Sequence, residues 1–239
     1  MSAHFAIPAT TFVLRAVIEA GLAKAYGALG PAPPVSVAPP PARSDNGPGA
    51  PSPEPTQVIL FMYHVQPNPA WRNMFDPTMD SSGNRVSRAP LALDLHYIVS
   101  AIGPDLEREA VFGTAVHALH RVGIVSRPLI KAILGAVAPP ASPSRLMDLL
   151  TTEKLDQQIE QITVSHQALD ADTLSRMWTS FQSPFRPSAG FLVTTVFLER
   201  DEVFPAAKPV TDVDLSVRSN VTRGPALSTD DLLVVDKAP

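Results

Sequence analysis

One short segment carries the residue types of a hydrolytic triad, namely Asp94, His96 and Ser100. They occur at even spacing in LALDLHYIVSAI (91–102), so in a strand they would lie on one face. A triad needs mutual hydrogen bonds, whereas residues two apart in a strand stand about 7 Å apart with parallel side chains. No G-x-S-x-G turn supplies a serine elsewhere. The spacing therefore favours a half-polar sheet face, at a subunit contact or against a helix.

Two further histidines, His117 and His120, could present both rings to one metal ion, because residues three apart in a helix share a side. Zinc usually takes three or four ligands, and neither an H-E-x-x-H motif nor a nearby carboxylate completes the set. We therefore expect no catalytic residue, no metal and no cofactor. A soluble metal-dependent enzyme that uses the Asp94 and His96 face stays the alternative.

The composition excludes several other kinds of site. The 239 residues include no cysteine, which excludes disulfides and thiolate chemistry. The net charge of −4 is too balanced for a nucleic-acid binder, and no phosphate-binding loop motif occurs. The best membrane candidate, residues 12–22, is shorter than the roughly 20 apolar residues of a span and contains Arg15 and Glu19. We expect neither membrane insertion nor a secretory signal.

The apolar periodicity predicts the elements that must position these residues. Strand 57–65 is apolar on both alternating faces, which predicts a central place in the sheet. The pattern predicts an α+β fold: a single domain with helices packed on a mixed or antiparallel sheet of four or more strands. The predicted helices cover 9–26, 104–122, 128–137 and 173–181, and the predicted strands cover 57–65, 91–102, 159–164 and 189–198.

Two segments differ from the rest of the chain. Residues 31–55 contain ten prolines, which predicts a mobile insertion within a domain of residues 1–199; a proline-rich cargo adaptor is the alternative. Residues 200–239 form an acidic C-terminal arm. It contains an alternation suited to adding a strand to a neighbouring sheet edge, although a disordered tail stays open. The apolar members of that alternation are Val213, Leu215 and Val217.

Three segments carry a family resemblance: YHVQPNPAWRNM (63–74), PLALDLHYIVSAIG (90–103) and LDADTLSRMWTSFQSPFRPSAGFLVTTVFLE (169–199). Their order and separation, with ALH at 118–120 between the last two, resemble the cap proteins of phage-tail-like contractile injection systems. The similarity covers most of residues 9–199. The proline-rich insertion and the length of the arm after Glu199 depart from the family pattern.

The resemblance implies a fold similar to phage tail terminators and a structural, non-enzymatic role. It implies a homohexameric ring that ends growth of the inner tube and anchors the last layer of sheath. The expected partners are therefore further copies of the chain, the tube and the sheath, with no nucleic acid. Assembly in the bacterial cytoplasm would follow, with release as part of an extracellular particle left open.

An assembly role needs interface anchors, and Trp and Arg in loops are typical of them. The candidates from the body of the domain are Trp71, Arg72, Phe185 and Arg186. The two arginines could instead be solvated or paired locally. Trp178 has helical spacing with Leu174 and Phe181, so we expect it in the core.

Overall fold

The computed structural model describes residues 5–42, 55–71, 90–136, 150 and 155–198, all within a compact unit that spans residues 1–206. They form a six-stranded sheet in the order β1-β2-β3-β6-β5-β4. Its strands are β1 (Val35–Ser36), β2 (Gln57–Pro67), β3 (Leu91–Ile102), β4 (Ile124–Val125), β5 (Ile162–Gln167) and β6 (Ser188–Leu198). The pair β1 and β2 is parallel and the other neighbours are antiparallel. The sheet is therefore mixed.

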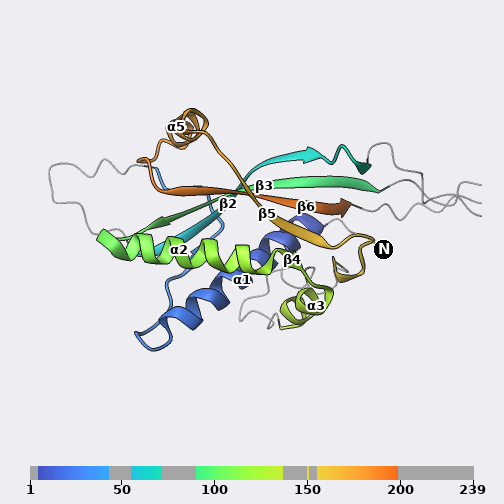
Figure 1. Cartoon of the computed structure of the whole chain (residues 1–239), viewed down its shortest axis with the longest axis horizontal. Helices are drawn as coiled ribbons and strands as arrows, with labels where there is room; N and C mark the ends of the chain where they lie inside the picture. The colour runs from blue at the N-terminus through green and yellow to red at the C-terminus, as the bar shows by residue number, and fades with distance from the viewer. Residues whose placement is uncertain (1–4, 43–54, 72–89, 137–149, 151–154, 199–239) are drawn as a thin grey trace, which may run out of the picture. The chain divides into compact units, whose positions relative to one another are not determined.

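Helices cover both faces of this sheet (Figure 1). One face carries α1 (Ala6–Tyr26), α2 (Asp105–Val122) and α3 (Arg127–Gly135), and the other carries α5 (Ala171–Ser180). A 3₁₀ turn, η2 (Leu155–Gln157), precedes β5. Local chemistry sets the boundaries: α2 follows Pro104 and ends at Gly123, whose φ of 50° favours glycine.

The main core lies between the sheet and the three-helix face. Alternate residues of β3, namely Leu95, Tyr97 and Val99, point into it and are fully buried. α1 supplies buried residues three and four apart, namely Val13, Leu14, Val17, Ile18 and Leu22. By length and composition α1 could cross a membrane, but these residues pack in the core, so we interpret it as a core helix.

The predicted α+β class is confirmed, and each predicted helix and strand has a counterpart. The sheet has six strands because the two-residue β1 and β4 extend it at each side. The loop prediction for residues 31–55 is wrong at Val35 and Ser36, which pair with β2 while Val35 is buried. Residues 43–54 of that segment, and the arm at 200–239, lie outside the described residues.

The 57–65 strand is an interior strand, as predicted, because β2 lies between β1 and β3. It is not at the middle of the sheet, and β1 pairs with only two of its residues, Val58 and Ile59. Both of its apolar faces are covered by helices or by residues next to them. Leu60 faces the main core, while the ring of Phe61 lies 5.6 Å from that of Phe181, just after α5.

Candidate assembly surfaces

The triad-like residues of β3 lie on one face but have separate partners. Asn68 Nδ2 donates to Asp94 Oδ1 at 2.7 Å, and His96 Nδ1 lies 2.8 Å from Gln167 Oε1. Ser100 Oγ is buried without a hydrogen-bond partner. All three residues are buried within the chain. This arrangement builds a polar layer against other elements and contains no triad.

Gln167 decides which nitrogen of His96 carries the proton. Its Oε1 can only accept, and it also accepts a bond from Tyr63 Oη at 3.3 Å, so His96 donates through Nδ1. The other nitrogen, Nε2, is buried without a partner, and the ring of His64 lies 5.1 Å away, centroid to centroid. Among the described residues no nucleophile bonds to His96. The sequence analysis missed Asn68 and Gln167, whose positions opposite β3 depend on strand register.

The two histidines of α2 are exposed. His117 and His120 lie on the solvent side of the helix, away from the buried Ala118 and Leu119. Within the part of the chain that the structure describes, no group of three or more His, Cys, Asp or Glu side chains could hold a metal ion. The pair therefore offers at most two ligands there.

Aromatic side chains gather where α5 meets β2, and we call Phe61, Trp178, Phe181 and Phe185 the α5 aromatic cluster. The ring of Trp178 lies 5.8 Å from that of Phe181 and 6.4 Å from that of Phe185. Trp178 is 2% exposed and its Nε1 donates to Ser188 Oγ at 3.1 Å, so its predicted core position is confirmed. Phe185, by contrast, is 64% exposed.

The other loop candidates have different surroundings. Trp71 packs edge-on against Phe197, with ring centroids 4.7 Å apart, and its N–H donates to Asn68 Oδ1 at 3.2 Å. Arg186 is only 6% exposed, which makes it a buried residue of the domain. Arg72 and the arm residues Val213, Leu215 and Val217 lie outside the described residues. Phe185 is thus the most exposed of the candidates that the structure describes.

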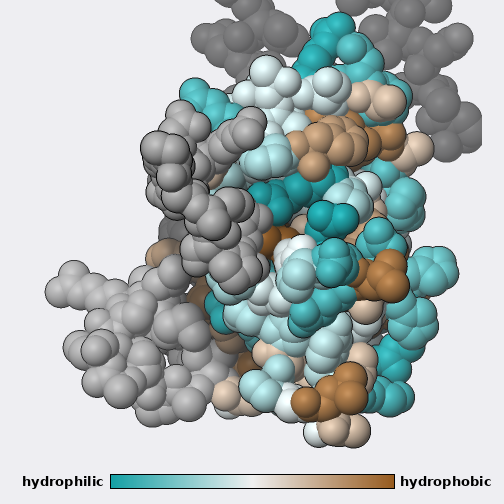
Figure 2. Space-filling model, turned by 90° about the vertical axis from the view of Figure 1, so that its left-hand side faces the viewer, coloured by the Kyte–Doolittle hydropathy of each residue, from teal (hydrophilic) through white to brown (hydrophobic). Residues whose placement is uncertain are grey.

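Exposed apolar side chains also occur at the end of the molecule where α1 finishes and α2 begins. Leu29 and Leu106 are 82% and 75% exposed, and both line a shallow hollow with Tyr26 and Pro33. Figure 2 shows this end, with small apolar patches among hydrophilic surface.

An apolar groove lies beside β2, with a volume of about 390 Å³. Its walls come from the first half of α1, from β2 and from the segment after β1. The lining residues are Ile7, Pro8, Thr11, Phe12, Arg15, Val37, Phe61, Met62 and Leu150. The sequence analysis did not predict this groove, because its walls come from segments far apart in the chain.

A hydrogen bond beside the groove links α1 to β3. Thr11 Oγ1 and Tyr97 Oη are 2.8 Å apart. Burial raises the pKa of Tyr97 well above its usual range, and the bond with Thr11 opposes this by a smaller amount. Tyr97 therefore stays neutral and acts as a structural anchor.

The chain matches one family of known domains and is similar to two solved proteins. The model of the Pvc16 N-terminal domain family matches residues 9–212. A solved PVC sheath/tube terminator of an extracellular contractile injection system, in the extended state, has 15% identity and a TM-score of 0.47 over 89% of this chain. The cap that terminates the tube of the anti-feeding prophage has 12% identity and a TM-score of 0.43 over 84% of this chain.

The chain spans 64% and 59% of the lengths of these two solved proteins. No curated protein sequence matches it. The family match is the stronger finding, because it extends over most of the sequence, including all three segments that carry the resemblance. The resemblance is thereby confirmed, and the chain belongs to the Pvc16 N-terminal domain family.

Proposed function

We propose that this chain is a structural cap subunit of a contractile injection system. Six copies form a ring that ends growth of the inner tube and anchors the last layer of sheath. The family match over residues 9–212 carries this proposal. The chemistry of the sheet agrees with it, because Asp94 and His96 are hydrogen-bonded to Asn68 and Gln167 rather than to each other.

The proposed contacts need exposed anchors on a rigid support. Phe185 meets this description, since it is exposed while its neighbour Trp178 is held by Ser188. Trp71 is the second anchor, braced by Phe197. Arg72 and the arm residues Val213, Leu215 and Val217 complete the proposed contact set with tube, sheath or neighbouring subunits. Arg186 is left out of this set because it is buried within the domain. Assembly takes place in the bacterial cytoplasm, and the finished particle is released.

Deleting the coding segment from a particle-producing strain tests the proposal. A cap subunit defines where the tube ends. Without it we expect tubes of variable length, with sheath that is detached or already contracted. Negative-stain electron microscopy measures the length distribution, and expression of the intact chain from a plasmid should restore it. Particles of normal, uniform length without the protein would overturn the proposal.

A further inference from the structure

A β-bulge places two histidines opposite each other on neighbouring strands. Between Met62 and His64 the pairing of β2 with β3 shifts by one residue, because Tyr63 is extra. The shift brings His64 opposite His96, and their ring centroids lie 5.1 Å apart with 46° between the planes. In a regular ladder Tyr63 would pair with His96, and His64 would lie on the other face of the sheet. The bulge therefore creates this histidine pair.

His96 has one ring nitrogen committed and the other available. Nδ1 donates to Gln167 Oε1 at 2.8 Å, which leaves the lone pair of the ring on Nε2. A histidine that binds a metal almost always donates its other N–H to an oxygen, because this bond fixes the ring and its tautomer. Gln167 gives His96 this support.

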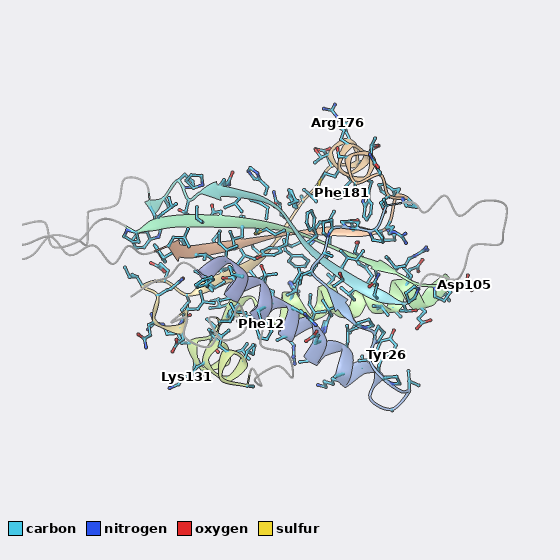
Figure 3. All side chains as sticks on the ribbon, turned by 180° about the vertical axis from the view of Figure 1, so that it is seen from behind. Phe12, Tyr26, Asp105, Lys131, Arg176 and Phe181 are labelled. Carbon is cyan, nitrogen blue, oxygen red and sulfur yellow. The ribbon has the colours of Figure 1, made fainter. Side chains whose placement is uncertain are left out.

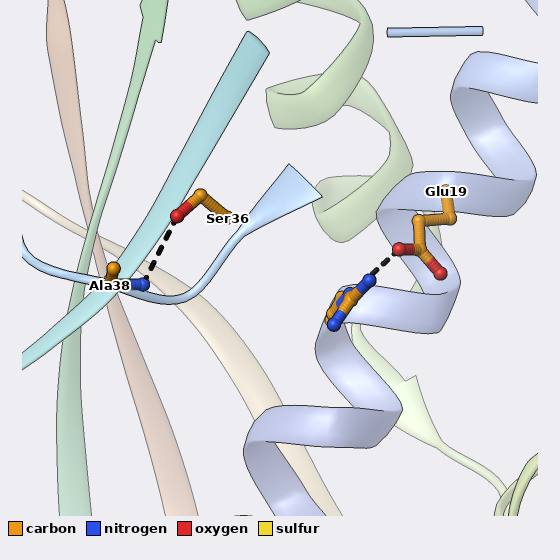
Figure 4. Close-up of polar contacts among 4 residues, drawn as sticks. Glu19, Ser36 and Ala38 are labelled. Carbon is orange, nitrogen blue, oxygen red and sulfur yellow. Dashed lines mark hydrogen bonds and ion pairs between the residues drawn. The ribbon is translucent and has the colours of Figure 1, made fainter. Parts of the chain in front are cut away.

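The available nitrogen of His96 is also unsatisfied. Two polar contacts near β2 show the usual situation: Arg15 Nε donates to Glu19 Oε1 at 2.7 Å, and Ser36 Oγ accepts from Ala38 N at 3.2 Å (Figure 4). Nε2 of His96, by contrast, is buried and no described residue donates to it. Such an atom has lost its hydrogen bonds with water and gained none in return. A metal ion on this lone pair would remove the deficit.

We infer that His64 and His96 bind one zinc ion, with Nε2 of His96 as the fixed ligand. Two imidazoles bound tetrahedrally to one zinc, at about 2.0 Å per bond, hold their ring centres about 5 Å apart. The observed 5.1 Å agrees with this distance. His64 is exposed, so its ring can turn towards the ion, and water can occupy the remaining positions from the same side.

The histidines of α2 lack these features. His117 and His120 are both exposed, and neither has a buried nitrogen without a partner. Among the described residues no third His, Cys, Asp or Glu joins His64 and His96, so the site is weaker than a four-ligand structural site. Zinc there would join β2 to β3 directly after the bulge, where the ladder is interrupted. This inference adds no reaction and does not depend on the proposed cap function.

Isothermal titration of the full chain with zinc chloride tests the inference. His64→Ala should weaken zinc binding by at least about tenfold, since even the loss of a supporting residue lowers metal affinity about 10–100-fold. The side chain is exposed, so circular dichroism should be unchanged. His117→Ala is the matched control, because it removes an exposed histidine elsewhere, and it should leave the affinity unchanged. Equal zinc binding by His64→Ala and the unmodified chain, or no binding by either, would overturn the inference.

Variants of Gln167 test the role of the fixed tautomer. Gln167→Leu removes the acceptor for Nδ1–H of His96 and should lower zinc affinity about 10–100-fold, whereas Gln167→Glu keeps an acceptor and should bind zinc at least as tightly as the unmodified chain. Long-range ¹H–¹⁵N NMR spectra distinguish the two ring nitrogens. Zinc should shift Nε2 of His96. Shifts confined to His117 and His120 would assign the ion to α2 and contradict the inference.

Discussion

Asp170 and Trp178 define the beginning and the buried side of α5. Asp170 Oδ1 accepts from Thr173 N at 2.6 Å, and its Oδ2 accepts from Thr173 Oγ1 at 3.1 Å. These bonds with Thr173 lower the pKa of Asp170 below its ordinary value of 3.8. Asp at such a position is a common helix start. The bond from Trp178 Nε1 to Ser188 Oγ, by contrast, joins α5 to β6 and has no signal in the sequence.

The Asp170 cap should make stability depend on pH. Because the folded pKa is lowered, the stabilisation is present above pH 3.8 and is lost as the pH falls through the folded value. Asn caps a helix without ionising, so Asp170→Asn should be close to the unmodified chain at pH 7. Below pH 3.8 the unmodified chain should lose more in melting temperature than the variant does. Thermal melts across pH measure this, and parallel profiles for the two proteins would contradict it.

The helix α1 packs on α2 at a position where no side chain fits. A Cβ at Gly21 would lie 2.8 Å from Ala118 Cβ, a rigid group that cannot rotate away. Glycine costs helix stability in isolation, by about 1 kcal/mol relative to alanine. Here glycine allows α1 and α2 to approach closely. The contact between the helices, rather than helix propensity, therefore explains why position 21 is glycine. Helix propensity alone would have favoured alanine.

Gly21→Ala should therefore lower the free energy of unfolding, by about 1–3 kcal/mol. Exchanging the two residues, as Gly21→Ala with Ala118→Gly, should recover stability to within about 1 kcal/mol of the unmodified chain. Gly113→Ala is the control, because a Cβ there meets nothing within 4 Å; it should stabilise α2. Urea denaturation measures all three. A double variant as unstable as Gly21→Ala would contradict the close-approach explanation.

At the scale of the whole molecule, the sheet separates two kinds of surface. Figure 3 shows Phe12 of α1 on one side of the sheet and Phe181, just after α5, on the other. The three-helix side holds the main core, whereas the α5 side combines the polar layer of β3 with the α5 aromatic cluster. The exposed Phe185 belongs to the α5 side, which we regard as the assembly side.

Phe185→Ser should reduce incorporation into particles by at least about tenfold if Phe185 is an interface anchor, since anchors contribute about 2 kcal/mol or more. Its fold should persist, because the side chain is 64% exposed. Leu106→Ser is the control. It removes a side chain that is 75% exposed in the first turn of α2, on the three-helix side of the sheet, so this variant should assemble normally. Quantitative blotting of purified particles measures incorporation. Equal incorporation of both variants would remove Phe185 from the proposed interface.

The β2 strand shows where sequence reasoning reaches its limit. Apolar residues on both faces predicted a covered strand, and β2 is covered on both faces by helices or residues next to them. The same pattern was taken to mean a central position, but β2 is only second in the sheet and its outer neighbour β1 is two residues long. Alternation reports what lies above and below a strand, whereas neighbours within the sheet bind through backbone groups that every residue carries. Strand order therefore leaves almost no trace in side-chain type.

The residue pattern by itself determined the α+β class, the approximate bounds of the long elements and the resemblance that identified the family. Only the tertiary structure decided that Asp94 and His96 bond to Asn68 and Gln167, and that a groove lies beside β2. The reason is physical. Periodicity and capping act between residues near in sequence, but partners and grooves arise from residues that only folding brings together.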